Sequence, residues 1–307
     1  MRIATEIPAR ADAAAARVDS PWRQFASEFA ESKLAVAGLA LLVAIILAAL
    51  AAPLISPQNP YDLAQLDVMD SKLAPGEQSM SGKTYWLGTD DQGRDMLSGI
   101  FYGLRISLAV GTSSTVIALA IGLVLGLAAA YFGGWVDSLI MRIADIQLSF
   151  PAILLALVLL AVLGQGVDKI VIALVTVQWA YYARTVRSSA IVERQKEYVE
   201  AARVLALSRP RIVFRHLLPN CLPPLIVVAT VQVAHAILLE STLSFLGLGL
   251  PITKPSLGLL ISNGFQYLLS GTYWISFYPG LALLLSILSI NLVADQLRDI
   301  LNPRLRK

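Results

Sequence analysis

The residues EAARVLA (200–206) and HLLPN (216–220) form a charged island between two strongly apolar parts of the chain. Apolar residues spaced at helical intervals from Val186 to Leu205 predict an amphipathic helix beside this island. The apolar runs on either side indicate helices that enter and leave a membrane. We interpret the island as a knob that fits a groove on another protein, the alternative being a polar loop without a partner.

The composition points to a protein that resides in a membrane. Of the 307 residues, 56% are hydrophobic and 15% are charged, and the mean hydropathy is +0.67. These values are too apolar for an ordinary soluble domain. Because a span needs about 20 apolar residues, we predict an all-α polytopic membrane protein. Its six transmembrane helices are expected near Leu34–Ala52, Ile106–Tyr131, Leu148–Leu163, Ile170–Ala183, Pro224–Leu243 and Trp274–Val293.

Basic residues set the expected orientation. With the N-terminus inside, roughly 18 of the 24 lysines and arginines fall on the cytoplasmic side, whereas the outer loop Pro53–Arg105 is acidic. Basic residues beside spans are retained in the cytoplasm, so both termini are expected there. The net charge of +3 then needs no nucleic-acid partner, and membrane lipid is the expected contact.

The chain divides into four expected segments. These are a cytoplasmic N-terminal segment (1–33), a first span with an extracytoplasmic loop (34–105), a five-helix core (106–293) with a cytoplasmic region at 184–222, and a cytoplasmic tail (294–307). The short loop after Leu163 contains glycine and aspartate, which favours a tight hairpin.

The N-terminal segment carries two further expectations. Residues 1–20 are expected to be mobile or weakly helical, and Pro21–Lys33 is expected to lie on the membrane as an amphipathic helix. Ala49-Leu50-Ala51 resembles a signal-peptidase site, which leaves a cleaved first span as an alternative. The apolar run is longer than a typical signal, so we favour a retained span.

The sequence contains few residues that could form a catalytic, metal or cofactor site. Cys221 is the single cysteine, and His216 and His235 are the only histidines, so no disulfide or cysteine- or histidine-based metal site is expected. Residues 90–95 lack the ligand spacing of a calcium loop, and no phosphate-binding glycine loop is present. We therefore expect neither an enzyme nor a cofactor in this chain.

A sharp turn is expected after the amphipathic helix. Ser208 can cap a second helix and Pro210 can occupy its first turn. This helix is expected over Arg211–Leu218, ending before Pro219. Glu200 is placed where the free amides of the turn, or a nearby arginine, could hold its carboxylate.

The island resembles the EAA signature of permease subunits in bacterial binding-protein-dependent ABC importers. Residues 86–108 and 240–249 resemble the second permease subunit of the dipeptide, oligopeptide and nickel branch, and the likeness runs from about Lys33 to Leu305. Ala206 departs from the signature, which has glycine there. Because alanine is less stable in a left-handed conformation, we expect a slightly different turn without loss of docking.

The resemblance implies a type I ABC importer permease fold in the bacterial cytoplasmic membrane. It also implies a second permease subunit, two ATPase subunits that bind ATP and Mg²⁺, and an extracytoplasmic substrate-binding protein. The residues that would couple ATP binding and hydrolysis to transport, through alternating access, are Glu200, Ala201, Ala202, Ala206, Leu207, Ser208 and Arg209. The outer loop and residues 254–273 would meet the binding protein.

The spans contain a few candidates for the transport pathway and for its joints. Gln232, His235 and Glu240 follow one another along one predicted span, where polar groups usually face protein or water. They could line a pathway or form hydrogen bonds between helices in the dimer, and Asp145 and Gln147 are similarly ambiguous. Glycines and prolines allow close helix contact or a change of direction; these residues are Gly122, Gly126, Ala130, Pro151, Pro223 and Pro279.

The cargo and the energy source leave alternatives open. Peptides are the expected cargo of this family branch, but nickel chelates, glutathione and oligosaccharides share its scaffold. A secondary transporter without an ATPase is the competing class. It predicts inverted repeats with charges near the midplane, and we find no convincing internal repeat in the sequence.

Overall fold

The computed structural model describes residues 20–80 and 82–301, and these residues are mainly helical. Within them no β-strand forms, and two isolated bridges, Gln78 with Thr84 and Thr89 with Asp95, are the extended pairings. The expectations for residues 1–19 and 302–307 lie outside the described residues. The α-helices are α1 (Pro21–Glu31), α2 (Lys33–Ile55), α3 (Met96–Phe132), α4 (Gly134–Leu148), α5 (Ala152–Leu163), α6 (Val167–Arg194), α7 (Glu197–Val204), α8 (Arg209–Ile212), α9 (Leu218–Phe245), α10 (Leu257–Phe265) and α11 (Trp274–Leu301).

Four helical segments are long and apolar enough to cross a membrane: α2, α3, the continuous run Arg209–Phe245, and α11. A fifth is obtained if α4 and α5, which meet at a bend of 90°, together form one broken span. These segments confirm the prediction of a helical protein with several membrane spans. The prediction of six spans is met only in part, because the arginines at positions 184 and 187 shorten the apolar stretch of α6.

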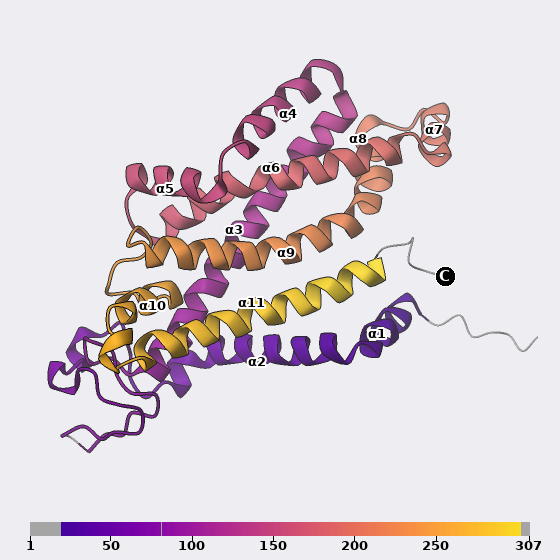
Figure 1. The fold of residues 1–307 in the computed structure, drawn as a ribbon. Helices are drawn as coiled ribbons and strands as arrows, with labels where there is room; N and C mark the ends of the chain where they lie inside the picture. The colour runs from indigo at the N-terminus through magenta and orange to yellow at the C-terminus, as the bar shows by residue number, and fades with distance from the viewer. Residues whose placement is uncertain (1–19, 81, 302–307) are drawn as a thin grey trace, which may run out of the picture.

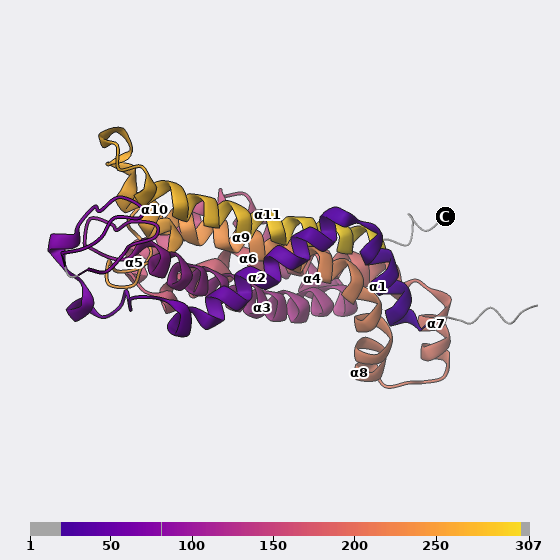
Figure 2. The same ribbon diagram turned by 90° about the horizontal axis from the view of Figure 1, so that it is seen from below.

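The helices α2, α6, α9 and α11 run along the length of the molecule, and α3 crosses them (Figure 1). The two ends of the bundle differ. α7, α8, α1 and the end of α11 gather at one end, whereas α10 and the chain between α2 and α3 lie at the other (Figure 2).

Several helix ends differ from the sequence prediction. α3 begins at Met96 because Asp95 accepts a hydrogen bond from Ser98 N and caps the helix. Pro151 does separate α4 from α5, as expected. Pro223 and Pro279 were expected to break or redirect helices, but both lie inside continuous helices, α9 and α11. The hairpin after Leu163 is confirmed, with φ of +84° at Gly164.

The centre of the bundle is the contact between α3 and α6. A Cβ atom on Gly122 would lie 2.4 Å from Tyr182 Cβ, and one on Gly126 would lie 2.6 Å from the Ala183 carbonyl oxygen. The two glycines therefore permit the close helix contact that the sequence predicted. They hold α3 against α6, which carries one wall of each pocket described below.

The acidic segment between α2 and α3, which was predicted to lie outside and is called the outer chain below (residues 56–80 and 82–95), folds onto itself instead of forming an open loop. Asp70 accepts hydrogen bonds from Ser79 Oγ at 2.6 Å and Tyr85 Oη at 2.8 Å. Arg94 is fully buried, and its Nη2 donates to the Ile252 carbonyl at 2.8 Å. This bond ties the outer chain to the turn between α9 and α10.

Candidate functional site

The charged island folds into a small helical knob, residues 197–217, at one end of the bundle. It comprises α7, α8 and the π-helix Val213–Leu217. The knob has a hydrophobic core of its own, in which Val199, Ala202, Ile212 and Leu217 are each at most 3% exposed. Apolar residues at helical spacing therefore bury one face of α7 against the segment that follows it.

The amphipathic helix predicted from Val186 to Leu205 is interrupted. α6 ends at Arg194, Lys196 adopts an extended conformation, and α7 begins at Glu197. The side chain of Glu193 stabilises the break, because it accepts hydrogen bonds from Lys196 Nζ at 2.6 Å and Tyr198 Oη at 2.6 Å. The interruption turns α7 away from the bundle.

α7 ends in a Schellman motif centred on Ala206. Leu207 N donates to the Ala202 carbonyl at 3.1 Å and Ala206 N donates to the Arg203 carbonyl at 2.9 Å. Ala206 has φ of +52°, which is the left-handed conformation. The expectation of a different turn was therefore wrong, since alanine adopts the conformation that favours glycine. The core of the knob, which Leu207 packs against, holds it there.

The segment after the turn is also helical, but its bounds differ from the prediction. Ser208 lies at the N-cap of α8 without a side-chain capping bond, and Pro210 occupies the first turn as expected. The helix does not end before Pro219. It continues through the π-helix into α9, where Pro219 lies in the first turn.

The outer face of the knob is both charged and apolar. Val204 is 87% exposed and Leu205 is 73% exposed. The sequence analysis placed Leu205 on the apolar face of the amphipathic helix but gave neither residue a coupling role. Their apolar character at the end of an amphipathic helix was the available signal. Contrary to expectation, the carboxylate of Glu200 forms no hydrogen bond or ion pair among residues 20–80 and 82–301. Its negative charge is available to a partner.

The seven residues predicted to couple the chain to an ATPase lie together in this knob, but they do not all face outward. Ala202 is buried and Leu207 packs against the core, so these two residues shape the knob. The exposed members are Glu200, Ala201, Ala206, Ser208 and Arg209.

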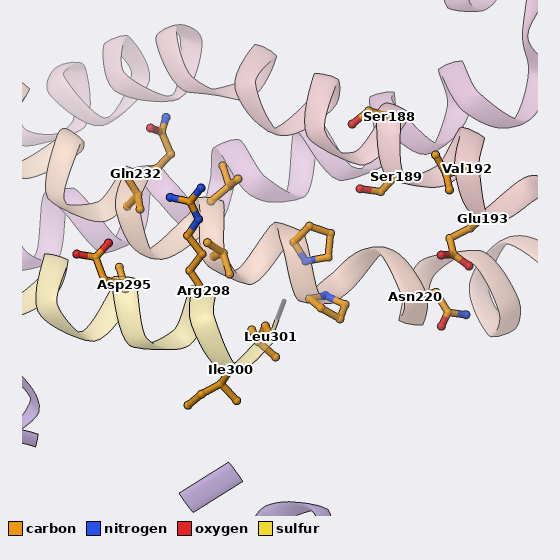
Figure 3. Close-up of a pocket in the computed structure, with 16 residues that line it drawn as sticks. Ser188, Ser189, Val192, Glu193, Asn220, Gln232, Asp295, Arg298, Ile300 and Leu301 are labelled. Atoms are coloured by element: carbon orange, nitrogen blue, oxygen red, sulfur yellow. The ribbon is translucent and has the colours of Figure 1, made fainter. Parts of the chain in front are cut away.

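Two pockets open beside the middle and the knob end of the bundle. The larger has a volume of about 1080 Å³ and lies between α6, α9 and α11 (Figure 3). The smaller has a volume of about 300 Å³ and lies between α5, α6 and α9. Gln232 lines both pockets, so they meet at this residue.

The three pathway candidates are separated by the structure. His235 lines the smaller pocket, and its Nδ1 lies 3.0 Å from Gln232 Oε1. Glu240 lines neither pocket. It is fully buried and accepts hydrogen bonds from Ser107 Oγ and Ser244 Oγ, each at 2.8 Å. Glu240 therefore joins α9 to α3 within this subunit, whereas the alternative stated from the sequence was hydrogen bonding between helices in the dimer.

The polar residues of α4 also join helices. Asp145 pairs with Arg184, and Gln147 Nε2 donates to the Val177 carbonyl at 3.0 Å. A second ion pair, between Arg187 Nε and Asp137 Oδ1 at 2.5 Å, links the same two helices. These contacts fix α4 against α6.

Residues 122–307, which include the knob and most of the lining of both pockets, match the family described as "Binding-protein-dependent transport system inner membrane component". The chain belongs to this permease family. Its residues 20–75 match a second family, described as "N-terminal TM domain of oligopeptide transport permease C". The permease is therefore a multi-pass protein of the inner membrane, in agreement with its apolar helices.

Curated relatives match the permease over nearly its whole length. A "Dipeptide transport system permease protein DppC" of Alkalihalophilus pseudofirmus is 39% identical over 287 residues, covering 94% of this chain and 91% of the relative. A "Di/tripeptide transport system permease protein DppC" of Pseudomonas aeruginosa is 39% identical, covering 94% and 93%. A "Glutathione transport system permease protein GsiD" of Pectobacterium atrosepticum is 37% identical, covering 94% and 93%.

A solved structure supports the same fold. A chain of the MetNI methionine ABC transporter in an inward-facing conformation matches with a TM-score of 0.54 and 21% identity. The match covers 67% of this permease and 98% of that chain. The helical core thus has the fold of an ABC importer permease.

Proposed function

We propose that this permease is one of two membrane subunits of an ABC importer that carries di- and oligopeptides into the cell. Relatives that are 39% identical over 94% of the chain, and that are named for dipeptide and di/tripeptide transport, support the cargo. A second candidate cargo is glutathione, itself a peptide, for which a relative at 37% identity is named.

The assembly we propose contains six spans, with α4 and α5 as a broken third span and α6 as the fourth. Both termini are cytoplasmic, because α1 and the end of α11 lie at the same end of the bundle as the basic knob (Figure 1). A second permease subunit pairs with this one, and an extracytoplasmic binding protein delivers cargo at the α10 end.

The observation that carries the coupling role is the exposed face of the knob. Val204 and Leu205 present apolar side chains beside the carboxylate of Glu200, which has no partner within the part of the chain that the structure describes. Such a face fits a groove on a protein partner. The partners are two ATPase subunits, which bind ATP and Mg²⁺, so the permease itself is not an enzyme and holds no cofactor.

The outer end of the permease offers a surface for the binding protein. Val68, Met69 and Met80 are 75%, 76% and 94% exposed on the outer chain, and Trp86 is 70% exposed. An apolar surface of this kind beside acidic residues is suited to transient docking. The folded outer chain would transmit the contact to the α9–α10 turn through Arg94.

The experiment that tests this function is uptake into liposomes that contain the permease with its co-purified partners and a binding protein. A labelled dipeptide, glutathione and a nickel chelate are compared with and without ATP. We expect dipeptide uptake that stops when ATP is withheld. Uptake of the nickel chelate alone would refute the peptide cargo, and uptake without ATPase subunits would indicate a secondary transporter.

A further inference from the structure

The smaller pocket combines an apolar wall with a cluster of polar side chains. Ala152, Val177, Leu238 and Leu239 supply the apolar part, and Gln178, Tyr181, Gln232 and His235 supply the polar part. Its volume of about 300 Å³ lies at the lower end of the range for small-molecule sites. Such sites use a few placed polar groups to orient a ligand against apolar walls.

The hydrogen bonds of this cluster leave one buried acceptor unpaired. Gln178 is 1% exposed, and its Nε2 donates to the Gln232 carbonyl at 3.3 Å. Because that carbonyl can only accept, the amide of Gln178 must present its nitrogen to it, and its oxygen must point elsewhere. Gln178 Oε1 accepts no hydrogen bond from any described residue.

An unpaired buried carbonyl oxygen is unfavourable, so Gln178 Oε1 requires a hydrogen-bond donor beyond those it has among the described residues. The neighbouring polar group is already engaged, because Gln232 Oε1 lies 3.0 Å from His235 Nδ1. Gln178 Oε1 therefore requires an N–H or O–H donor. A peptide bond supplies such a donor in every cargo of the proposed class.

The smaller pocket adjoins the larger one. Gln232 also lines the larger pocket, whose wall toward the knob includes Ser188, Ser189 and Asn220 and whose α11 side carries Asp295 and Arg298 (Figure 3). A molecule that moves from the smaller pocket to the larger one must pass Gln232. The two pockets are thus consecutive.

We propose that the smaller pocket is a transient station for a peptide group, in which Gln178 Oε1 accepts the N–H of a passing peptide bond. The contact between His235 Nδ1 and Gln232 Oε1 holds the side-chain amide of Gln232 in place beside it. This inference rests on the proposed function, because it assigns a recognition residue to the same import pathway. It identifies Gln178, which the sequence analysis did not single out, as a specificity-determining residue.

The test compares glycylglycine with glycylsarcosine, whose peptide nitrogen is methylated and has no N–H. ATP-driven uptake of each is measured in liposomes for the wild type and for Gln178→Met, which keeps the length of the side chain and removes the acceptor. The same binding protein delivers both peptides, so its own preference cancels between the two permeases. Gln165→Met is the matched control, because Gln165 Nε2 donates to the Gly247 carbonyl and neither residue lines a pocket.

We expect the preference for glycylglycine to fall about five- to tenfold in Gln178→Met, which corresponds to the loss of one hydrogen bond. The control should keep the preference of the wild type. An unchanged preference in Gln178→Met refutes the proposal that Gln178 Oε1 accepts the peptide N–H. So does failure of Gln178→Met to co-purify with the second permease subunit, because the pocket would then receive a side chain of that subunit. Failure of the wild type to import either peptide instead refutes the proposed cargo.

Discussion

The hydroxyl of Tyr198 donates a hydrogen bond to Glu193 Oε2 at 2.6 Å and so joins α7 to the end of α6. Asn220 Nδ2, on α9, donates to the same hydroxyl at 3.1 Å. Burial and the adjacent Glu193 carboxylate raise the pKa of Tyr198 to about 12, so the hydroxyl retains its proton at physiological pH. One side chain therefore fixes the knob to two helices of the bundle.

Tyr198→Phe should loosen the knob while leaving its core intact. We expect uptake to fall about fivefold while ATP hydrolysis continues, because the lost hydrogen bond contributes roughly 1 kcal/mol at this partly exposed position. Uptake and ATP hydrolysis are measured in the same liposomes, and the ratio of peptide imported to ATP hydrolysed checks this expectation. Tyr278→Phe, on α11 and outside both the knob and residues 254–273, is the control and should keep the wild-type ratio.

Glu200→Lys should abolish uptake without affecting insertion into the membrane. The substitution reverses a charge that has no partner among the described residues and that faces outward from the knob. Glu197→Lys makes the same change on an exposed position of the same helix, and we expect it to retain most uptake. Equal uptake by wild type and Glu200→Lys, at equal expression, would contradict the coupling role.

Ala206→Gly should stabilise the turn of the knob. The left-handed conformation of Ala206 costs about 1 kcal/mol relative to glycine, and the greater freedom of glycine in the unfolded chain offsets part of the gain. We expect a small rise in the Tm of the purified complex and unchanged uptake. Ala206→Val should lower the Tm, since a β-branched side chain is less compatible with positive φ. A higher Tm in the valine variant would contradict this account.

The outer chain should become less stable as the pH rises toward neutrality. Burial raises the pKa of Asp90 from its ordinary value of 3.8 to about 6. The folded chain therefore binds more protons than the unfolded chain between these values, and the free energy of unfolding falls by roughly 3 kcal/mol as the pH rises from about 4 to about 6. Above pH 6 this contribution is constant.

Asp90→Asn should remove this pH dependence. Asparagine keeps an oxygen that can accept from Gln92 N and Arg94 N, as Asp90 Oδ1 does at 2.8 and 2.9 Å. Hydrogen exchange of residues 70–95 at pH 4.5 and pH 7 measures the difference. We expect protection in the wild type to decrease at pH 7 and protection in the variant to change little. An equal decrease in both proteins would show that another group titrates.

The apolar runs predicted the membrane class and the approximate places of the helices, because a long apolar segment has few other stable arrangements. Helix ends were less predictable. Pro223 and Pro279 remain inside helices, since neighbouring helices and local adjustments satisfy the backbone groups that proline frees. Only tertiary packing, which a single sequence does not display, decides whether a proline bends a helix.

The sequence predicted where in the chain the site lies more accurately than which of its side chains are exposed. All seven coupling candidates lie in the knob, but the burial of Ala202 follows from its contact with a segment several residues further along the chain. The role of Glu240 was ambiguous because its partners include Ser107, which lies 133 residues away. Gln178 was missed because its significance depends on a hydrogen bond to the backbone of another helix.

The run Arg209–Phe245 consists of 37 helical residues without a loop, and it connects the knob to the turn held by Arg94. A movement of the knob is therefore passed along one helical backbone to the outer end, with no loop between them to absorb it. The π-helix at Val213–Leu217 is the stretch of this run whose hydrogen-bond spacing differs. A change there between π and α spacing would rotate the knob relative to α9.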